Sequence, residues 1–284
     1  MEYIKLMRPK HWIKNLLVFL PLVFSGSLFK ESNFFICLFG YICFNFIASC
    51  VYIMNDIKDK EKDKNHVTKC KRPIASGKVS VRNAIIELFL LLIISVIIVW
   101  YFNIPTFSIL LLLLYFVINI GYSFGLKNVP ILDVSIVAFG FLIRVLFGAT
   151  LLDLNVSNWL YLAILTLSFF MALGKRRNEV EKNGDKARLV LKYYSKNFLD
   201  KNMYMFLSMA IIFYSLWATD KTMVEYSNNQ LIWTIPIVML LCMRYSMNIE
   251  GNGDGDPVEV IMNDKVIIVL GFVLALVLFL ILYI

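Results

Sequence analysis

Long apolar stretches, separated by shorter polar segments, recur along almost the whole chain. Each is about 17 to 25 residues long, the length that an α-helix needs to cross a hydrocarbon core of about 30 Å. Because no Pro-, Gly- or Ser-rich linker divides the chain, the pattern predicts a single all-α, polytopic membrane domain over residues 1–284. The nine predicted transmembrane helices are residues 12–29, 33–54, 83–102, 105–123, 131–150, 158–174, 202–219, 231–248 and 266–284.

The composition agrees with this prediction. The chain is 60% hydrophobic and 17% charged, which is too apolar for one soluble globule of 284 residues. The first span follows a basic start, as in a signal peptide, and the SGS at 25–27 resembles a cleavage site. The apolar stretch is long and further spans follow it, so we expect a retained helix.

Basic residues alternate between the two ends of the predicted spans, as the positive-inside rule requires. The intervening loops carry only Lys30 and Lys221, and Arg144 lies inside a span. This alternation predicts a cytoplasmic N-terminus, an outer C-terminus and charged loops on the cytoplasmic side. Lys and Arg number four up to Lys14, nine in 55–82, one in 122–130, nine in 175–201 and two in 244–265.

Cysteine and histidine usage excludes two kinds of site. The chain has five cysteines and two histidines, with no Cys-x-x-Cys pair, so neither a disulfide framework nor a zinc site is expected. The net charge of +8 fits attraction to anionic lipid heads, and it also fits phosphate binding. Nucleic acid is not an expected partner, because the basic residues lie in short loops beside the spans and no recognition module is present.

The charged segment after the second span, NDIKDKEKDKNHVTKCKRPIASGKVS at 55–80, contains three aspartates. If the helix continues past Asn55, then Asp56, Asp59 and Asp63 lie within an arc of roughly 60° and rise about 10 Å. Carboxylates in this arrangement suit Mg²⁺, which commonly bridges one or two of them to substrate phosphates. The alternative is a solvated charge lattice, such as Lys60 with Asp56.

Four cations follow this aspartate segment: Lys69, Lys71, Arg72 and Lys78. Positive side chains beside a carboxylate-bound metal suit a polyphosphate, because the metal neutralises some oxygens and the cations pair with the others. Anchoring to the lipid surface is the alternative interpretation.

The turn before the fifth span has a similar character. Asp133 lies where that span begins, and Arg144 follows 11 residues later on almost the same face. An ionisable residue inside a span normally faces an interior cavity, so Arg144 is a candidate site residue, or else a structural partner of a buried carboxylate. Tyr122, Ser123 and Lys127 form a polar rim at this turn.

The loops after the sixth and eighth spans add weaker signals. Lys175, Arg176 and Arg177 end the sixth span, and Glu179 follows closely. The run GNGDGDP lacks EF-hand spacing, so calcium is not expected; its glycines suit either close backbone approach to a ligand or a flexible turn.

The chain has no nucleophile triad, P-loop or dinucleotide fingerprint, which leaves metal-assisted departure of a phosphate-type leaving group.

Several segments, in order along nearly the whole chain, resemble one family. They are RPKHWIKN, NDIKDKEKDKNH with KRPIASG, YSFGLKNVPILDVSIVAFGFLIRVLFGA, GKRRNE and MRYSMNIEGNGDGDPVEVIMND. The resemblance is to the decaprenyl-phosphate phosphoribosyltransferase branch of the UbiA prenyltransferase superfamily. It implies nine transmembrane helices around a central cavity, with cytoplasmic cap loops.

The resemblance also assigns a metal site. An NDxxDxxxD motif, here Asn55, Asp56, Asp59 and Asp63, would bind Mg²⁺ and a diphosphate, and the three aspartates are the expected catalytic and metal-binding residues. Aromatic prenyltransferases of the superfamily carry a second motif, DxxxD. Here Val137 stands four residues after Asp133, which weakens the reading as generic prenyl transfer.

The implied reaction transfers 5-phosphoribose from phosphoribosyl pyrophosphate to a polyprenyl phosphate and releases diphosphate. An apolar groove would hold the lipid tail, and no strong general base is required because the lipid phosphate attacks already ionised. The expected substrate-binding residues are Lys14, Asn55, Lys71, Arg72, Tyr122, Lys127, Asp133, Arg144, Lys175, Arg176 and Glu179.

Two alternatives remain open. One is transfer of a prenyl group from a prenyl diphosphate to an aromatic or other acceptor. The other is a membrane transporter, for which the intramembrane Arg144 and a weak repeat of helical hairpins are the evidence.

Overall fold

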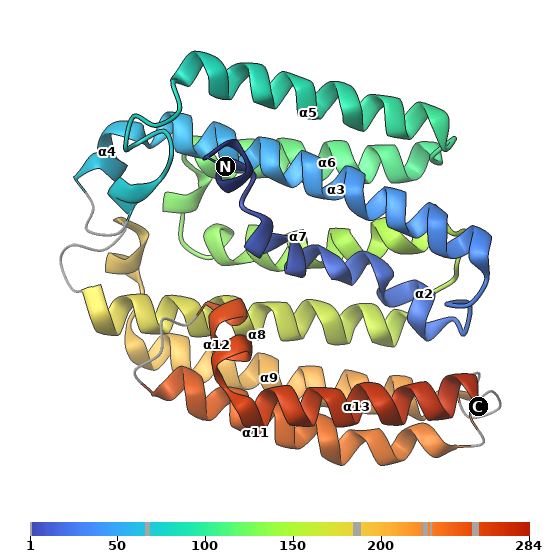
Figure 1. Ribbon diagram of the computed structural model, residues 1–284. Helices are drawn as coiled ribbons and strands as arrows, with labels where there is room; N and C mark the ends of the chain where they lie inside the picture. The colour runs from blue at the N-terminus through green and yellow to red at the C-terminus, as the bar shows by residue number, and fades with distance from the viewer. Residues whose placement is uncertain are drawn as a thin grey trace. The chain divides into compact units, whose positions relative to one another are not determined.

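The computed structural model describes residues 2–65, 69–183, 189–221, 223, 227, 229–251 and 256–284, and every regular element among them is a helix (Figure 1). The chain forms two compact units, Met1–Leu126 with Ile143–Leu154 and Lys127–Leu142 with Asn155–Ile284. The boundary falls inside α7 (Leu132–Leu151), so this helix contributes one half to each unit. A single domain over the whole chain stays a prediction.

The first unit is organised around α3 (Glu31–Lys58), which packs against most of the other helices of this unit (Figure 1). Its core contains the fully buried Phe44, Phe147 and Leu22. At Gly148 a Cβ would overlap the carbonyl oxygen of Val18, so this glycine lets the N-terminal segment approach the α7 backbone. The other elements are α1 (Glu2–Met7), the 3₁₀ helix η1 (Pro9–Phe19), α2 (Leu20–Phe24), α4 (Lys60–Lys64), the 3₁₀ turn η2 (Lys69–Lys71), α5 (Val81–Tyr101) and α6 (Thr106–Phe124).

The second unit is a set of long helices in which α8 packs against α9 and α11 against α13. Its core includes Phe170, Leu199, Met203 and Ile249, all fully buried. The elements, besides the first half of α7, are α8 (Asn158–Asn183), the 3₁₀ helix η5 (Leu189–Tyr193), α9 (Lys196–Ala218), the 3₁₀ turn η6 (Gln230–Trp233), α11 (Thr234–Glu250), α12 (Pro257–Asn263) and α13 (Lys265–Tyr283).

Helix boundaries follow from side-chain caps. The Ser80 hydroxyl accepts a hydrogen bond from the Asn83 backbone N–H at the start of α5, and Ser195 does the same for Phe198 at the start of α9. Asp264 begins α13 by accepting from the backbone N–H of Val266 and Ile267. Between such caps α5 and α13 expose apolar side chains along most of their length, as helices that face lipid do.

The described helices agree with most of the predicted spans. Each predicted range from 33–54 onward overlaps one long described α-helix, and seven helical segments of the described residues are long and apolar enough to cross a membrane. The α9 helix, which covers the predicted span 202–219, is not one of the seven, so the count of nine is not confirmed.

The first predicted span, 12–29, differs from the single α-helix that the sequence suggested. Residues 12–24 belong to η1, a long 3₁₀ helix, and to the short α2 that follows it, while residues 25–29 lie outside both helices. Cross-segment hydrogen bonds hold this geometry: Asn15 donates to the Asn45 side chain at 2.6 Å, and Tyr41 donates to the Trp12 carbonyl at 3.4 Å. Because a 3₁₀ helix rises about 2.0 Å per residue, η1 and α2 together still cover about 30 Å.

Candidate functional site

The aspartate segment at the end of α3 is nearly, but not wholly, a continuous helix. The α3 helix ends at Lys58, and Asp59 has φ −88° and ψ 7° before α4 begins at Lys60. The backbone N–H of Asp59 still donates to Asn55 at 2.9 Å, and that of Asp63 to Asp59 at 2.8 Å. The predicted uninterrupted ladder is therefore broken at Asp59.

Two of the three aspartates converge on one arginine. Asp56 and Asp63 are buried, with 2% and 4% of their surface exposed, whereas Asp59 is half-buried. The Arg72 Nη1 donates to Asp56 at 3.0 Å and to Asp63 at 2.6 Å, so one guanidinium joins both carboxylates. Arg8 forms a further ion pair with Asp56.

Local backbone geometry delivers both arginines. The turn that carries Arg72 is closed by hydrogen bonds from the Ser76 N–H to the Arg72 carbonyl at 2.9 Å and from the Val79 N–H to the Pro73 carbonyl at 3.0 Å. Arg8 has φ 55° and ψ 60°, a left-handed conformation that is unfavourable for a non-glycine residue. Its guanidinium also lies 5.1 Å from the centroid of the Tyr52 ring.

Arg8 was not among the residues predicted for the site. The available signal was its place in RPKHWIKN, but nothing in the sequence pairs it with an aspartate 48 positions away. We call Arg8, Asp56, Asp63 and Arg72 the first cluster.

Asp133, in the second unit, is the centre of another group of polar side chains. Its carboxylate is fully buried and accepts hydrogen bonds from Arg176 Nε at 2.7 Å and from the Tyr194 hydroxyl at 2.5 Å. Arg176 also pairs with Glu179 at 2.7 Å. We call Asp133, Arg176, Glu179 and Tyr194 the second cluster.

Tyr194 was also missed by the sequence analysis. Its hydroxyl oxygen accepts the Ile131 backbone N–H at 2.5 Å, next to the start of α7, where Ile131 has φ 67°. Burial, together with the hydrogen bond to Asp133, raises the pKa of Tyr194 to about 12. The phenol therefore keeps its proton and donates it to the carboxylate throughout the physiological range.

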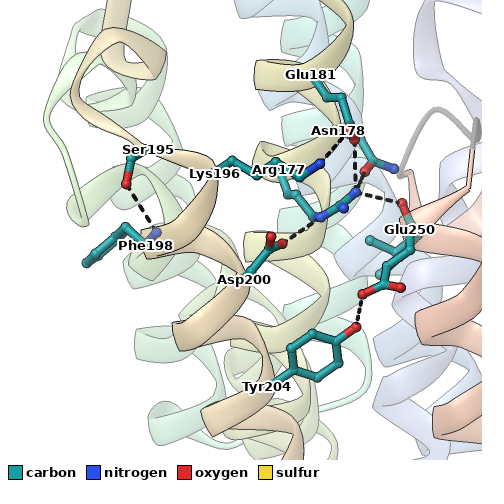
Figure 2. A network of polar contacts seen from close by, with 10 residues as sticks. Arg177, Asn178, Glu181, Ser195, Lys196, Phe198, Asp200, Tyr204 and Glu250 are labelled. Carbon is teal, nitrogen blue, oxygen red and sulfur yellow. Dashed lines mark hydrogen bonds and ion pairs between the residues drawn. The ribbon is translucent and has the colours of Figure 1, made fainter.

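The basic residues around Arg176 have separate partners in the second unit. Lys175 forms an ion pair with Asp256 at 2.8 Å, and Asp256 accepts from the Val258 N–H to begin α12. Arg177 lies between three helices and donates to Asp200 of α9 at 2.6 Å and to the Ile249 carbonyl of α11 at 3.4 Å (Figure 2).

Arg144 lies in the half of α7 that belongs to the first unit. Its Nε donates to Asn15 Oδ1 at 2.6 Å, and its Nη2 donates to the Tyr115 hydroxyl at 3.1 Å. Arg144 is 6% exposed, and its guanidinium lies 5.2 Å from the Phe44 ring centroid.

The other predicted site residues lie in 3₁₀ segments or near the ends of α-helices. Within the first unit they are Lys14, half-buried in η1; Asn55, half-buried near the end of α3; Lys71, exposed in η2; and Tyr122, half-buried near the end of α6. Lys127 is half-buried in the 3₁₀ turn η3 (Leu126–Asn128). Most of the run GNGDGDP, residues 252–255, lies outside the described residues.

A model of the UbiA prenyltransferase family matches residues 16–250. The chain belongs to the UbiA prenyltransferase family. Two curated relatives, both named decaprenyl-phosphate phosphoribosyltransferase, agree with this. The one from Mycolicibacterium smegmatis is 32% identical, with 94% of this chain and 88% of the relative covered. The one from Corynebacterium glutamicum is 30% identical, with 94% and 82% covered.

Solved structures support the UbiA fold. The structure of a UbiA homologue from Archaeoglobus fulgidus bound to DMAPP and Mg²⁺ gives a TM-score of 0.75 at 20% identity, and the match covers 98% of this chain and 96% of that one. The same homologue bound to GPP and Mg²⁺ gives a TM-score of 0.72 at 18% identity, with 99% of each chain covered. This UbiA-family chain is therefore a multi-pass membrane transferase.

Whether this UbiA protein offers ligands for Mg²⁺ can be judged from its donor set. Within the described ranges, no group of three or more His, Cys, Asp or Glu side chains gathers as a metal site. Asp56 and Asp63 nevertheless converge on the same guanidinium. Since Mg²⁺ is usually held by one or two carboxylates plus substrate phosphates and water, this pair fits the metal when a diphosphate supplies further oxygens. Asp59 as a third ligand stays a prediction.

Proposed function

We propose that this UbiA-family transferase moves 5-phosphoribose from phosphoribosyl pyrophosphate to a polyprenyl phosphate and releases diphosphate. The observation that carries the proposal is the convergence of two buried carboxylates and two arginines in the first cluster. The names of the two relatives support the choice of substrates. The mean hydropathy of +0.73 and the exposed apolar helices support a lipid acceptor.

The charge balance of the first cluster explains how it would receive a diphosphate. Asp56 and Asp63 would hold Mg²⁺, which supplies neutralisation of the charge that develops on the departing diphosphate. Arg8 and Arg72 currently neutralise these carboxylates, so they become available to diphosphate oxygens when the carboxylates take the metal. The net charge of the four side chains is zero, which favours the metal and the diphosphate entering together.

The bonds and charges of the proposed reaction balance without an external acid or base. The bond between ribose C1 and the diphosphate oxygen breaks, and its electron pair leaves with the diphosphate. An oxygen of the ionised lipid phosphate then forms the new bond to C1. Arg8 and Arg72 would stabilise the leaving group, and the buried position of Asp56 and Asp63 would keep water from the bond being broken.

We assign the remaining cations to phosphate binding by position and charge. Lys14 and Lys71 in the first unit, and Lys127, Lys175 and Arg176 in the second, are the proposed phosphate-binding residues. Lys175 and Arg176 are held by carboxylates, at 2.8 Å and 2.7 Å, which restricts their side chains before a substrate arrives. The alternation of basic residues supports a cytoplasmic N-terminus and an outer C-terminus.

The test of this proposal uses purified protein, Mg²⁺, a polyprenyl phosphate and phosphoribosyl pyrophosphate labelled in the ribose. Label should enter the lipid fraction only when both the metal and the lipid phosphate are present. A parallel reaction replaces the labelled donor with a labelled prenyl diphosphate and adds an aromatic acceptor. Consumption of the prenyl diphosphate, without any label from ribose in the lipid, would show that the chain is a prenyl transfer enzyme instead.

A further inference from the structure

The interior of the first unit contains a second group of polar side chains, none of which belongs to the first cluster. Arg144 donates to Asn15 at 2.6 Å and to Tyr115 at 3.1 Å, and Asn15 donates to Asn45 Oδ1 at 2.6 Å. All four are at least nine-tenths buried. A charged guanidinium inside a membrane-spanning helix is costly, so this arrangement requires a compensating role.

Hydrogen-bond accounting shows an unused donor in this group. Asn45 Nδ2 is buried and has no hydrogen-bond partner, although its Oδ1 is engaged by Asn15. A buried donor without an acceptor costs about 1 to 3 kcal/mol, which is why such groups are rare and call for an explanation. The Asn15 amide therefore lies between the Arg144 cation and the unpaired N–H of Asn45. This arrangement indicates that a hydrogen-bond acceptor, and in particular an anion, binds here.

The position of Asn45 on α3 relates this group to the first cluster. Asn45 and Asp56 are 11 residues apart on the same helix, which gives a rise of about 16 Å and an angular offset of about 20°. One face of α3 therefore presents Asp56 at its end and Asn45 three turns deeper.

A donor with an anion at each end matches this spacing. Phosphoribosyl pyrophosphate carries a diphosphate on C1 and a phosphomonoester on C5, at opposite ends of the sugar. When extended, and with a metal ion at one end and an arginine side chain at the other, it reaches across a gap of this order. A prenyl diphosphate would instead place an apolar chain against the Arg144 guanidinium, which is unfavourable because the chain offers no acceptor to the guanidinium or to Asn45 Nδ2.

We infer that Arg144, with Asn45, Asn15 and Tyr115, forms the subsite for the 5-phosphate of the donor and selects phosphoribosyl over prenyl donors. The inference rests on the proposed function, because it assumes that the diphosphate end lies at the first cluster. The guanidinium provides charge-assisted hydrogen bonds to phosphate oxygens, and Asn45 Nδ2 gains the acceptor that it lacks. Entry of the phosphate requires these side chains to change rotamer.

The test is equilibrium binding by calorimetry in detergent, with Mg²⁺ and three probes: pyrophosphate, phosphoribosyl pyrophosphate and geranyl diphosphate. In the Arg144→Met variant, the preference for phosphoribosyl pyrophosphate over pyrophosphate should fall by at least about tenfold, the effect of losing a hydrogen bond to a charged group. The affinity for pyrophosphate alone should stay within about threefold, because that probe does not reach Arg144.

Two further variants separate the subsite from a structural role. Asn45→Leu keeps a similar volume, removes the amide donor and should lower the same preference by a smaller factor. Arg82→Met makes the same chemical change as Arg144→Met, but at an exposed position in the first turn of α5, and should leave all three affinities unchanged. In the wild type, ribose 5-phosphate should bind together with Mg²⁺ and pyrophosphate, without competition.

Each outcome decides between the hypotheses. An unchanged preference in both interior variants would overturn the subsite, and so would an equal loss of pyrophosphate and phosphoribosyl pyrophosphate binding. Competition between ribose 5-phosphate and pyrophosphate in the wild type overturns it without any variant. If the wild type binds geranyl diphosphate but not phosphoribosyl pyrophosphate, then the proposed function itself fails.

Discussion

The two carboxylate clusters of this UbiA-family protein differ in how their charges are satisfied. In the first cluster, two buried carboxylates share two arginines, and Arg72 joins both of them. In the second cluster, a single buried aspartate has one oxygen engaged by Arg176 and the other by Tyr194. Shared ion pairs can be exchanged for a metal ion and a diphosphate, whereas a carboxylate held by a cation and a phenol is fixed in place.

The residue four positions after Asp133 supports this difference between the two clusters. Val137, four residues later, packs against the hydrophobic core of the second unit instead of supplying another carboxylate. Glu179 is engaged with Arg176 at 2.7 Å. We therefore expect metal binding at the first cluster, whereas in the second cluster the hydrogen bonds to Asp133 connect the start of α7 to Arg176 and Tyr194.

The strongest challenge to this comparison is the Asp56→Asn substitution. Removing one carboxylate leaves Arg8 and Arg72 with less negative charge and removes a proposed metal ligand, so turnover should fall by at least about a hundredfold. Initial rates of ribose transfer to the lipid fraction, at saturating Mg²⁺, provide the measurement.

The matched control is Glu61→Gln, which neutralises an exposed carboxylate in the neighbouring α4 helix. It should retain near-normal rates. Both variants should insert into the membrane in wild-type amounts. If Asp56→Asn transfers ribose at a rate close to that of Glu61→Gln, the first cluster is not the metal site and the contrast between the clusters fails.

A second test concerns the exchange of partners in the first cluster. Arg8→Gln removes a cation that competes with a metal for Asp56, so Mn²⁺ alone should bind more tightly, by several-fold up to about tenfold. The same change removes a diphosphate partner, so pyrophosphate binding in the presence of the metal should weaken by a similar factor. Electron paramagnetic resonance of Mn²⁺, with and without pyrophosphate, measures both effects.

A higher affinity for Mn²⁺ together with a lower affinity for pyrophosphate would show that Asp56 and Arg8 exchange each other for the metal and the diphosphate. Lys5→Gln is the control, because Lys5 is exposed in α1 and pairs only with the nearby Glu2 among its described contacts. If Arg8→Gln weakens both ligands, then Arg8 only supports the local structure, and the first cluster resembles the second more than we propose.

The sequence was informative where a single segment carried the pattern. Span lengths located the long helices, and the spacing of Asp56 and Asp63 together with the following Arg72 located most of the first cluster. The interruption at Asp59 was not predictable, because a break of one residue depends on contacts that the helix makes and not on its own spacing.

Residues contributed by distant segments were the ones missed. Arg8 reaches Asp56 across 48 positions and Tyr194 reaches Asp133 across 61, and neither pairing has a local signal. The 3₁₀ geometry of η1 has a similar origin, since the hydrogen bond from Asn15 to Asn45 holds it against α3. Arg144 was found because a charge inside an apolar span is conspicuous, but its amide and phenol partners required the fold.

The smallest effect on turnover is expected for a substitution in the second cluster, where we expect Tyr194 to hold Asp133 in place. Tyr194→Phe removes the hydroxyl that donates to Asp133 and accepts from the Ile131 N–H, so the variant should lose about 1 to 3 kcal/mol of stability. Its turnover should change by only a few-fold, because no proposed substrate contact is lost. Thermal unfolding in detergent measures the first quantity, and initial rates measure the second.

The pH dependence of this loss provides an independent check. The pKa of Tyr194 is raised to about 12 in the folded protein, whereas an unfolded tyrosine titrates near pH 10. Between these values the unfolded state binds fewer protons than the folded state, so the wild type loses stability as the pH rises. The difference in stability between the wild type and Tyr194→Phe should therefore narrow. Tyr193→Phe, at the exposed neighbouring position, should show neither effect. A gap that stays constant from pH 8 to 11 would mean that the phenol does not hold Asp133 through its proton.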